Sequence, residues 1–238
     1  MKFTTTALAL VLVASAAPAA AQYMSAPPPQ NPPQTAVQPQ QQNDNTAQKS
    51  GGIQPSAKAR KALVDLQTAV NANDTATIPA KIAAAQAVAS TKEDRYLIGE
   101  LELKAAIASK NDNAMASGVD AIAASGYETP AQVAKLYAGV AGNFFNAKQL
   151  DLAAAAYEKA VALDPRNTDL LLNLGETRFA QGRQADAVAT FKRAIQADAA
   201  AGQKAPEAVY KRALSIAYDA KLPNAVDLAR EWVAAYPS

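Results

Sequence analysis

The sequence predicts an all-α protein made of about five stacked helical hairpins. One pattern of small and aromatic residues occurs twice, 34 positions apart, at Ala153, Tyr157 and Ala160 and again at Ala187, Phe191 and Ala194. A fixed period of this length is typical of stacked helix pairs. After Gly51-Gly52 the composition shifts abruptly to Ala, Leu, Val, Lys and Glu, which are good or tolerable helix formers. Arrays of this kind usually bind other molecules and rarely catalyse reactions.

The start of the chain is typical of a secretory signal. Lys2 supplies a positive charge, residues 7–14 form a short apolar core, and Ala19-Ala20-Ala21 is a small-residue cleavage site. We therefore expect a signal peptide at 1–21, cleavage after Ala21, and a periplasmic or secreted mature protein. The alternative is an uncleaved anchor, although the apolar core is short for a membrane span. No integral membrane segment is expected after signal removal.

A linker rich in Pro and Gln is expected at 22–55. It contains Pro27-Pro28-Pro29 and Pro32-Pro33 and has few large apolar residues. Such a segment buries too little apolar surface to offset the entropy of ordering, and its prolines favour an extended spacer. The simplest interpretation is a tether between the signal and the domain. The alternatives are a segment that spans a layer of the cell envelope and a proline-rich motif that binds a partner. The helical domain then occupies 56–238.

The first two hairpins are expected at 57–71 with 76–90 and at 93–109 with 113–124. Ser56 is a plausible N-cap for the first helix, and Pro79 falls in the first turn of the second, where proline does little harm. Leu63, Leu66 and Val70 recur at helical spacing. Gly126 marks a helix stop.

The remaining three hairpins are expected at 130–147 with 151–163, at 168–198 around a turn at Gly182, and at 206–236 around a turn at 221–223. Thr129-Pro130 combines an N-cap with a proline at the first helical position. Residues 202–205 are an insertion of four relative to strict periodicity, so a longer loop is expected before the last hairpin.

Composition excludes several classes of active site. The chain has no Cys and no His, which removes disulfides, the usual zinc sites, and catalytic triads or dyads built on His. Its 23 basic and 21 acidic residues are scattered, which argues against a nucleic-acid partner. No phosphate-binding, dinucleotide-binding or nucleophile-elbow motif occurs. We therefore expect no enzyme, no cofactor and no metal.

The third to fifth hairpins resemble the tetratricopeptide repeat, whose pattern is W-x2-L-G-x2-Y followed by A-x3-F and a later A and P. The fourth hairpin has Leu171 at the Trp position, then Leu174-Gly175, Ala187 and Phe191. The best repeats are expected at 134–167, 168–201 and 206–238. The fifth departs from the pattern at Ala229 and Trp232. The resemblance implies a right-handed superhelix of antiparallel helix hairpins, whereas 57–128 match only weakly and are either degenerate repeats or another hairpin type.

The resemblance also implies a binding groove lined by the first helix of each hairpin. Carried over residue by residue, its candidate groove residues are Lys135, Phe145, Asn146, Asp169, Leu172, Glu176, Phe179, Glu207, Tyr210, Leu214 and Tyr218. This is a mixed apolar and acidic track with aromatic anchors, so an apolar or basic peptide is expected to fit. Phe145 and Phe179 are as easily explained as packing residues, while exposure in the groove is favoured for Tyr210 and Tyr218 because a Tyr hydroxyl tolerates water.

The expected function is that of an exported adaptor that binds a protein or peptide partner. Two alternatives stay open: a structural accessory subunit of an envelope complex, and a binder of cell-wall glycan. The sequence names neither the partner nor the oligomeric state.

Overall fold

The computed structural model describes residues 52–237. The signal sequence expected at 1–21, and the expected linker as far as residue 51, lie outside the described residues and stay predictions. From Pro55 onward the chain forms one unit. None of the helices described is both long enough and apolar enough to cross a bilayer.

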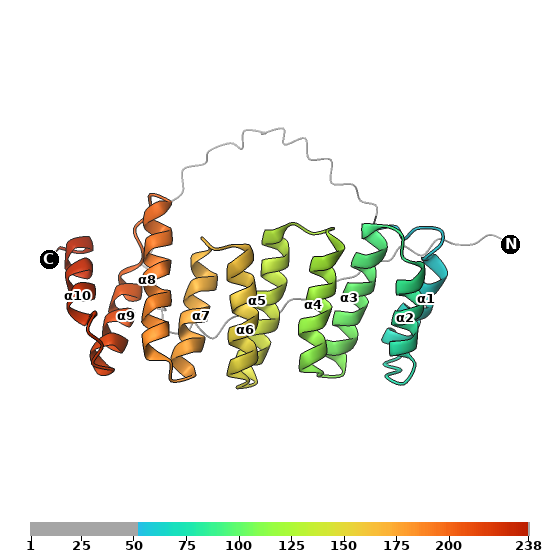
Figure 1. Ribbon diagram of the computed structural model, residues 1–238, viewed down its shortest axis with the longest axis horizontal. Coiled ribbons are helices and arrows are strands. Elements are labelled where there is room, and N and C mark those ends of the chain that lie inside the picture. The colour runs from blue at the N-terminus through green and yellow to red at the C-terminus, as the bar shows by residue number, and fades with distance from the viewer. Residues whose placement is uncertain (1–51, 238) are drawn as a thin grey trace, which may run out of the picture. The chain divides into compact units, whose positions relative to one another are not determined.

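Within residues 52–237 the chain is all-α, as predicted, and consecutive helices pair into five antiparallel hairpins that follow one another in a row (Figure 1). The helices are α1 (Arg60–Asn71), α2 (Ile78–Val88), α3 (Lys92–Ala108), α4 (Asp112–Ser125), α5 (Pro130–Asn146), α6 (Leu150–Leu163), α7 (Thr168–Ala180), α8 (Gln184–Ala200), α9 (Glu207–Asp219) and α10 (Ala225–Ala235). We call α1, α3, α5, α7 and α9 the A helices and their partners the B helices.

Side-chain caps fix where several helices begin. Thr129 accepts a hydrogen bond from the backbone N–H of Gln132, whose side chain in turn accepts one from the Thr129 N–H, and Pro130 follows at the first helical position. Thr91 and Asp94 form the same reciprocal box at the start of α3. Each box satisfies two backbone donors that a helix start would leave unpaired. The cap predicted at Thr129 is therefore confirmed.

The repeated small and aromatic residues form the core between helices. Ala153, Ala160, Ala187 and Ala194 are fully buried, and Phe191 is nearly so. Alanines at these positions let neighbouring helices approach closely, and the aromatic ring fills the space that remains. Since one hairpin cannot bury its own apolar face, the stack depends on contact between successive hairpins.

The second hairpin achieves close packing through glycine. A Cβ added at Gly118 would lie 2.7 Å from the Cα of Leu103, and one added at Gly99 would lie 2.8 Å from the backbone N of Ile122. Backbone atoms cannot move aside as a flexible side chain can. Gly99 of α3 and Gly118 of α4 therefore set the distance between these two helices.

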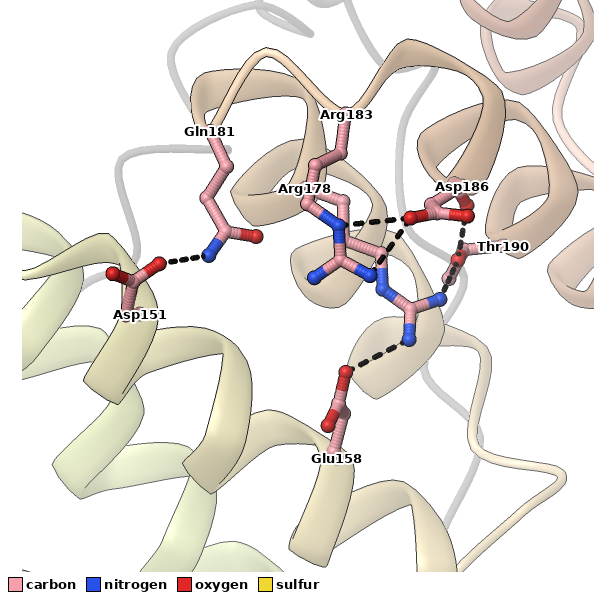
Figure 2. Close-up of polar contacts among 7 residues, drawn as sticks. All are labelled: Asp151, Glu158, Arg178, Gln181, Arg183, Asp186 and Thr190. Carbon is pink, nitrogen blue, oxygen red and sulfur yellow. Dashed lines mark hydrogen bonds and ion pairs between the residues drawn. The ribbon is translucent and has the colours of Figure 1, made fainter.

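A polar network joins the third and fourth hairpins. Arg178 of α7 donates one hydrogen bond to Glu158 of α6 at 2.8 Å and another to the buried hydroxyl of Thr190 in α8 at 2.6 Å. Figure 2 shows this guanidinium between α6 and α8, with Gln181 donating to Asp151 farther along α6. Arg178 of α7 thus links α6 and α8.

Candidate functional site

Each of the five hairpin turns contains one residue in the left-handed region, at the same place in the turn. These residues are Asn73, Lys110, Lys148, Gly182 and Lys221, with φ between 52° and 77°. The shared conformation aligns the five hairpins residue by residue, independently of sequence similarity.

This alignment places exposed apolar side chains in a row across four A helices. The residue three positions before the left-handed residue is Ile107 in α3, Phe145 in α5, Phe179 in α7 and Tyr218 in α9. Ile107 is 42% exposed, Phe179 36% and Tyr218 75%, and Phe145 is partly exposed. The equivalent residue in the first hairpin, Val70, is buried. We call Ile107, Phe145, Phe179 and Tyr218 the apolar row.

Cationic side chains accompany two members of this row. The Arg212 guanidinium lies 4.3 Å from the ring centroid of Phe179, and the Lys148 ammonium lies 5.9 Å from that of Phe145. A cation near an aromatic face is attracted by the negative face of the ring. Arg212 lies in close contact with the Phe179 ring, whereas Lys148 lies near the outer limit of such an interaction with Phe145.

The α7 helix shows why Phe179 faces outward. Its neighbour Arg178 is turned inward to Glu158 and Thr190 (Figure 2). Consecutive helical residues point about 100° apart, so the inward contact of Arg178 carries the next side chain toward solvent. The ordinary packing role considered for Phe179 does not account for this exposure.

Most of the predicted groove residues on α5 and α7 are open to solvent. Lys135, Asn146 and Asp169 are exposed, and Leu172 is partly buried against the core of the last two hairpins. Glu176 is also accessible, but it is not a free acid. Its carboxylate accepts hydrogen bonds from Arg212 of α9 at 2.7 and 2.8 Å.

The prediction that Tyr210 is exposed in the groove is wrong. Tyr210 is 8% exposed and packs edge-on against Tyr236 of α10, with ring centroids 6.1 Å apart; burial raises the pKa of its hydroxyl. The left-handed turn residues Gly182 and Lys221 are 39 positions apart, one more than the sequence register assumed. In this register Tyr210 matches the buried Leu171, and Tyr218 matches Phe179.

The acidic character expected of the groove is largely neutralised within the chain. Glu207 pairs with Lys211 at 3.0 Å and accepts a hydrogen bond from the Trp232 indole at 3.0 Å; these two contacts lower the pKa of its carboxyl. With Glu176 paired to Arg212, Asp169 is the remaining acid among the predicted residues. The structure therefore gives the groove little preference for basic ligands.

Sequence reasoning missed Ile107 because the second hairpin lacks the repeat's sequence pattern. The signal that identifies it is the left-handed Lys110, which a sequence does not reveal, since lysine rarely adopts this conformation.

A groove of about 520 Å³ opens between α9 and α10. Leu214 and Tyr218 line it from α9, as do Val226, Ala229 and Trp232 from α10. We call this the end groove. Among residues 52–237, no cluster of three or more Asp or Glu side chains is arranged to hold a metal ion.

These hairpins, with shared turns and exposed A-helix side chains, define an α-helical repeat protein whose class generally binds other proteins. One part of the chain, residues 143–200, is similar to the tetratricopeptide repeat. Family models described as "TPR repeat" and "Tetratricopeptide repeat" match residues 143–182 and 168–200. The matched segments cover α6, α7 and α8, where the sequence pattern is strongest.

Several solved structures match the chain at low sequence identity. YrrB, described as a TPR protein with an unusual peptide-binding site, is 14% identical; the match covers 76% of this chain and 87% of YrrB, with a TM-score of 0.39. MamA is 15% identical over 74% of this chain and 91% of its own, with a TM-score of 0.41. BtubC from P. vanneervenii is 14% identical; the match covers 75% of this chain and 73% of BtubC, with a TM-score of 0.42. No curated protein matches the sequence.

Proposed function

We propose that this protein is an exported adaptor that binds an extended apolar segment of a partner protein along the apolar row. The observation that carries the proposal is the recurrence of an exposed apolar side chain at one position in four successive A helices. Soluble proteins rarely leave such side chains aligned in the absence of a partner, because each costs free energy when hydrated. Export rests on the predicted signal at 1–21.

The row favours an apolar partner over a charged one. Phe145 and Phe179 offer aromatic surface to an incoming apolar side chain, and aromatic residues with few rotatable bonds are common hot spots of protein recognition. Because α3, α5, α7 and α9 alternate with B helices, a partner segment must be extended to reach more than one member of the row.

Alanine substitution along the row tests this proposal. Phe179→Ala and Ile107→Ala should each reduce the amount of partner captured from a native envelope extract, and the double variant should reduce it further. Leu163→Ala is a matched control, because Leu163 is also 36% exposed but belongs to the B helix α6. Circular dichroism should show all variants folded. Capture that is unchanged in the double variant, or lost equally in the control, would overturn the proposal.

A further inference from the structure

The Tyr157 hydroxyl in α6 has no hydrogen-bond partner within residues 52–237. The side chain is 4% exposed, and burial raises the pKa of its hydroxyl. The hydroxyls of Tyr96 and Tyr137, whose side chains are also buried, each donate to a carboxylate of the chain. A buried hydroxyl without such a partner costs free energy, so the hydroxyl of Tyr157 has no role that these internal contacts explain.

The core position of Tyr157 is filled by phenylalanine in the next hairpin. Phe191, 34 residues later, is 1% exposed, and its ring lies 3.0 Å from the place that a Cβ on Gly175 would take. The ring alone therefore fills this space between an A helix and its B helix. A phenylalanine at 157 would pack in the same way, so the core does not require the hydroxyl.

The hydroxyl lies beside Gly142 on α5. It is 3.8 Å from the place that a Cβ on Gly142 would take, and no atom of another helix comes closer. An alanine at 142 would therefore make an ordinary van der Waals contact, so packing does not require the glycine, which is also less favourable than alanine within a helix. Gly142 is partly exposed, and the Tyr157 hydroxyl oxygen is not fully shielded from solvent.

Gly142 lies one helical turn before Phe145 of the apolar row. The equivalent residues of the neighbouring A helices, six positions before the left-handed turn residue, are Lys104 in α3 and Glu176 in α7. Both carry long charged side chains, and α5 lies between these two helices in the row of hairpins (Figure 1). At this level of the row, α5 alone of the three therefore has no side chain that would keep another chain at a distance.

This gap has the chemistry to receive the main chain of a bound segment. Glycine lets another backbone approach closely, and an extended segment presents carbonyl oxygens that have no partner within the segment. A tyrosine hydroxyl can donate to such an oxygen. A side chain that covers position 142 would block both the approach and the hydrogen bond.

We propose that the main chain of the partner segment crosses Gly142 and that one of its carbonyl oxygens accepts a hydrogen bond from the Tyr157 hydroxyl. This inference rests on the proposed function, since it places the segment that binds along the apolar row. The contact adds to the apolar one, because the next side chains of the segment then meet the ring of Phe145. It favours an extended partner, in which the carbonyl oxygens are free to accept, over a helical one, in which they are paired.

Binding of a defined peptide tests this contact. The probe is a peptide selected from a random phage-displayed library for binding to the wild-type protein and synthesised with blocked ends. Tyr157→Phe should weaken its binding about threefold to tenfold, as expected for the loss of one hydrogen bond, and should leave the protein folded. Tyr210→Phe is the matched control, because the Tyr210 hydroxyl also lacks a partner within residues 52–237 but belongs to a ring packed against Tyr236 in the last hairpin. Its binding should be unchanged.

Phe179→Ala, measured with the same peptide, separates this inference from the proposed function. If Phe179→Ala weakens binding and Tyr157→Phe does not, the hydroxyl contact is overturned and the apolar row remains the binding surface. If neither variant weakens binding, the proposed function and the hydroxyl contact both fail.

Gly142→Ala tests the gap without touching the hydroxyl. The added methyl group should weaken binding of the peptide while the helix becomes more stable. Gly139→Ala, also in α5 and exposed, should stabilise the helix without loss of binding. The double variant Gly142→Ala, Tyr157→Phe should bind no more weakly than Gly142→Ala alone, because both changes remove the same hydrogen bond. Losses that multiply in the double variant would show two independent contacts and contradict the inference.

Discussion

Arg212 of α9 and Glu176 of α7 form a two-point ion pair that joins successive A helices. The guanidinium donates from Nε to one carboxylate oxygen at 2.8 Å and from Nη2 to the other at 2.7 Å. The same guanidinium lies over Phe179. One side chain thus links two hairpins and contacts a member of the apolar row.

A double-mutant cycle on Glu176→Ala and Arg212→Ala should give a coupling free energy of about 0.5–1 kcal/mol at low salt, toward the upper end of the usual range for surface pairs, because two parallel hydrogen bonds join side chains that are only about a third exposed. The coupling should shrink at high salt. The control is the exposed pair Asp227 and Arg230, whose coupling should be near zero. Equal coupling in both pairs, measured by urea unfolding, would refute the structural role of Arg212.

Two glycine substitutions should have opposite effects on stability. Gly118→Ala should lower the free energy of unfolding by about 1–3 kcal/mol, because its methyl group would overlap the Leu103 backbone. Gly139→Ala, in the middle of α5, should raise it by about 0.5–1 kcal/mol, since no atom lies within 4 Å of the added Cβ and alanine favours the helix. Thermal unfolding followed by circular dichroism measures both, and a stabilising Gly118→Ala would show that α3 and α4 are farther apart than described.

Asp94 should make stability fall at low pH. It is fully buried; burial alone raises its pKa, but hydrogen bonds from Ser90, Ser56 and Thr91 outweigh this and lower the pKa to about 2. Because the folded pKa lies below the unfolded value of 3.8, the carboxylate stabilises the fold fully above about pH 4 and loses this contribution as pH falls toward 2. The contribution is on the order of 2 kcal/mol.

Asp94→Asn should remove most of this pH dependence between pH 4 and 2 and lower stability at pH 7. Asp227→Asn is a control, since that carboxyl is 64% exposed and should change little. Urea unfolding at a series of pH values measures the difference. If the free energy of unfolding of Asp94→Asn still falls as steeply between pH 4 and 2, other carboxyl groups determine this pH dependence.

The last hairpin should unfold before the rest of the stack. Trp232 is the only tryptophan of the chain and lies in α10, which has a neighbouring hairpin on one side alone in the structure described. In dilute protein its fluorescence should change at a lower denaturant concentration than the circular dichroism signal, because repeat stability depends on neighbour contacts. A Trp232→Phe, Phe145→Trp variant reports on α5 and should follow the circular dichroism. Coincident transitions at both positions would indicate one cooperative unit.

The hairpin architecture was predictable because its signals are local. A helix start is marked by Thr129-Pro130 and a helix stop by Gly126. The repeated alanines mark the positions where helices pack closely. The close approach of α3 and α4 was not predictable, since Gly99 and Gly118 acquire their role only when the two helices meet. A sequence pattern cannot show which glycine touches a backbone.

The candidate site was only partly predictable, for two physical reasons. The loop before α9 shifts the register by one residue more than expected, which moved Tyr210 into the core and aligned Tyr218 with Phe179. A sequence also does not reveal ion pairs between helices. Glu176 was therefore predicted to be an unpaired acid in the groove, although it forms an ion pair with Arg212. Exposure and pairing both depend on neighbours that lie far away in the chain.

Site-specific photo-crosslinking in the native cell envelope tests the central claim most directly. A photoreactive phenylalanine analogue replaces Ile107, Phe145 or Phe179 in turn, and the control positions are Ala162 and Ala189, which are exposed on the B helices α6 and α8. We expect all three apolar-row positions to crosslink to the same partner protein and the control positions to give no such product. Crosslinks to that partner from Ala162 and Ala189 but not from the row would contradict the account.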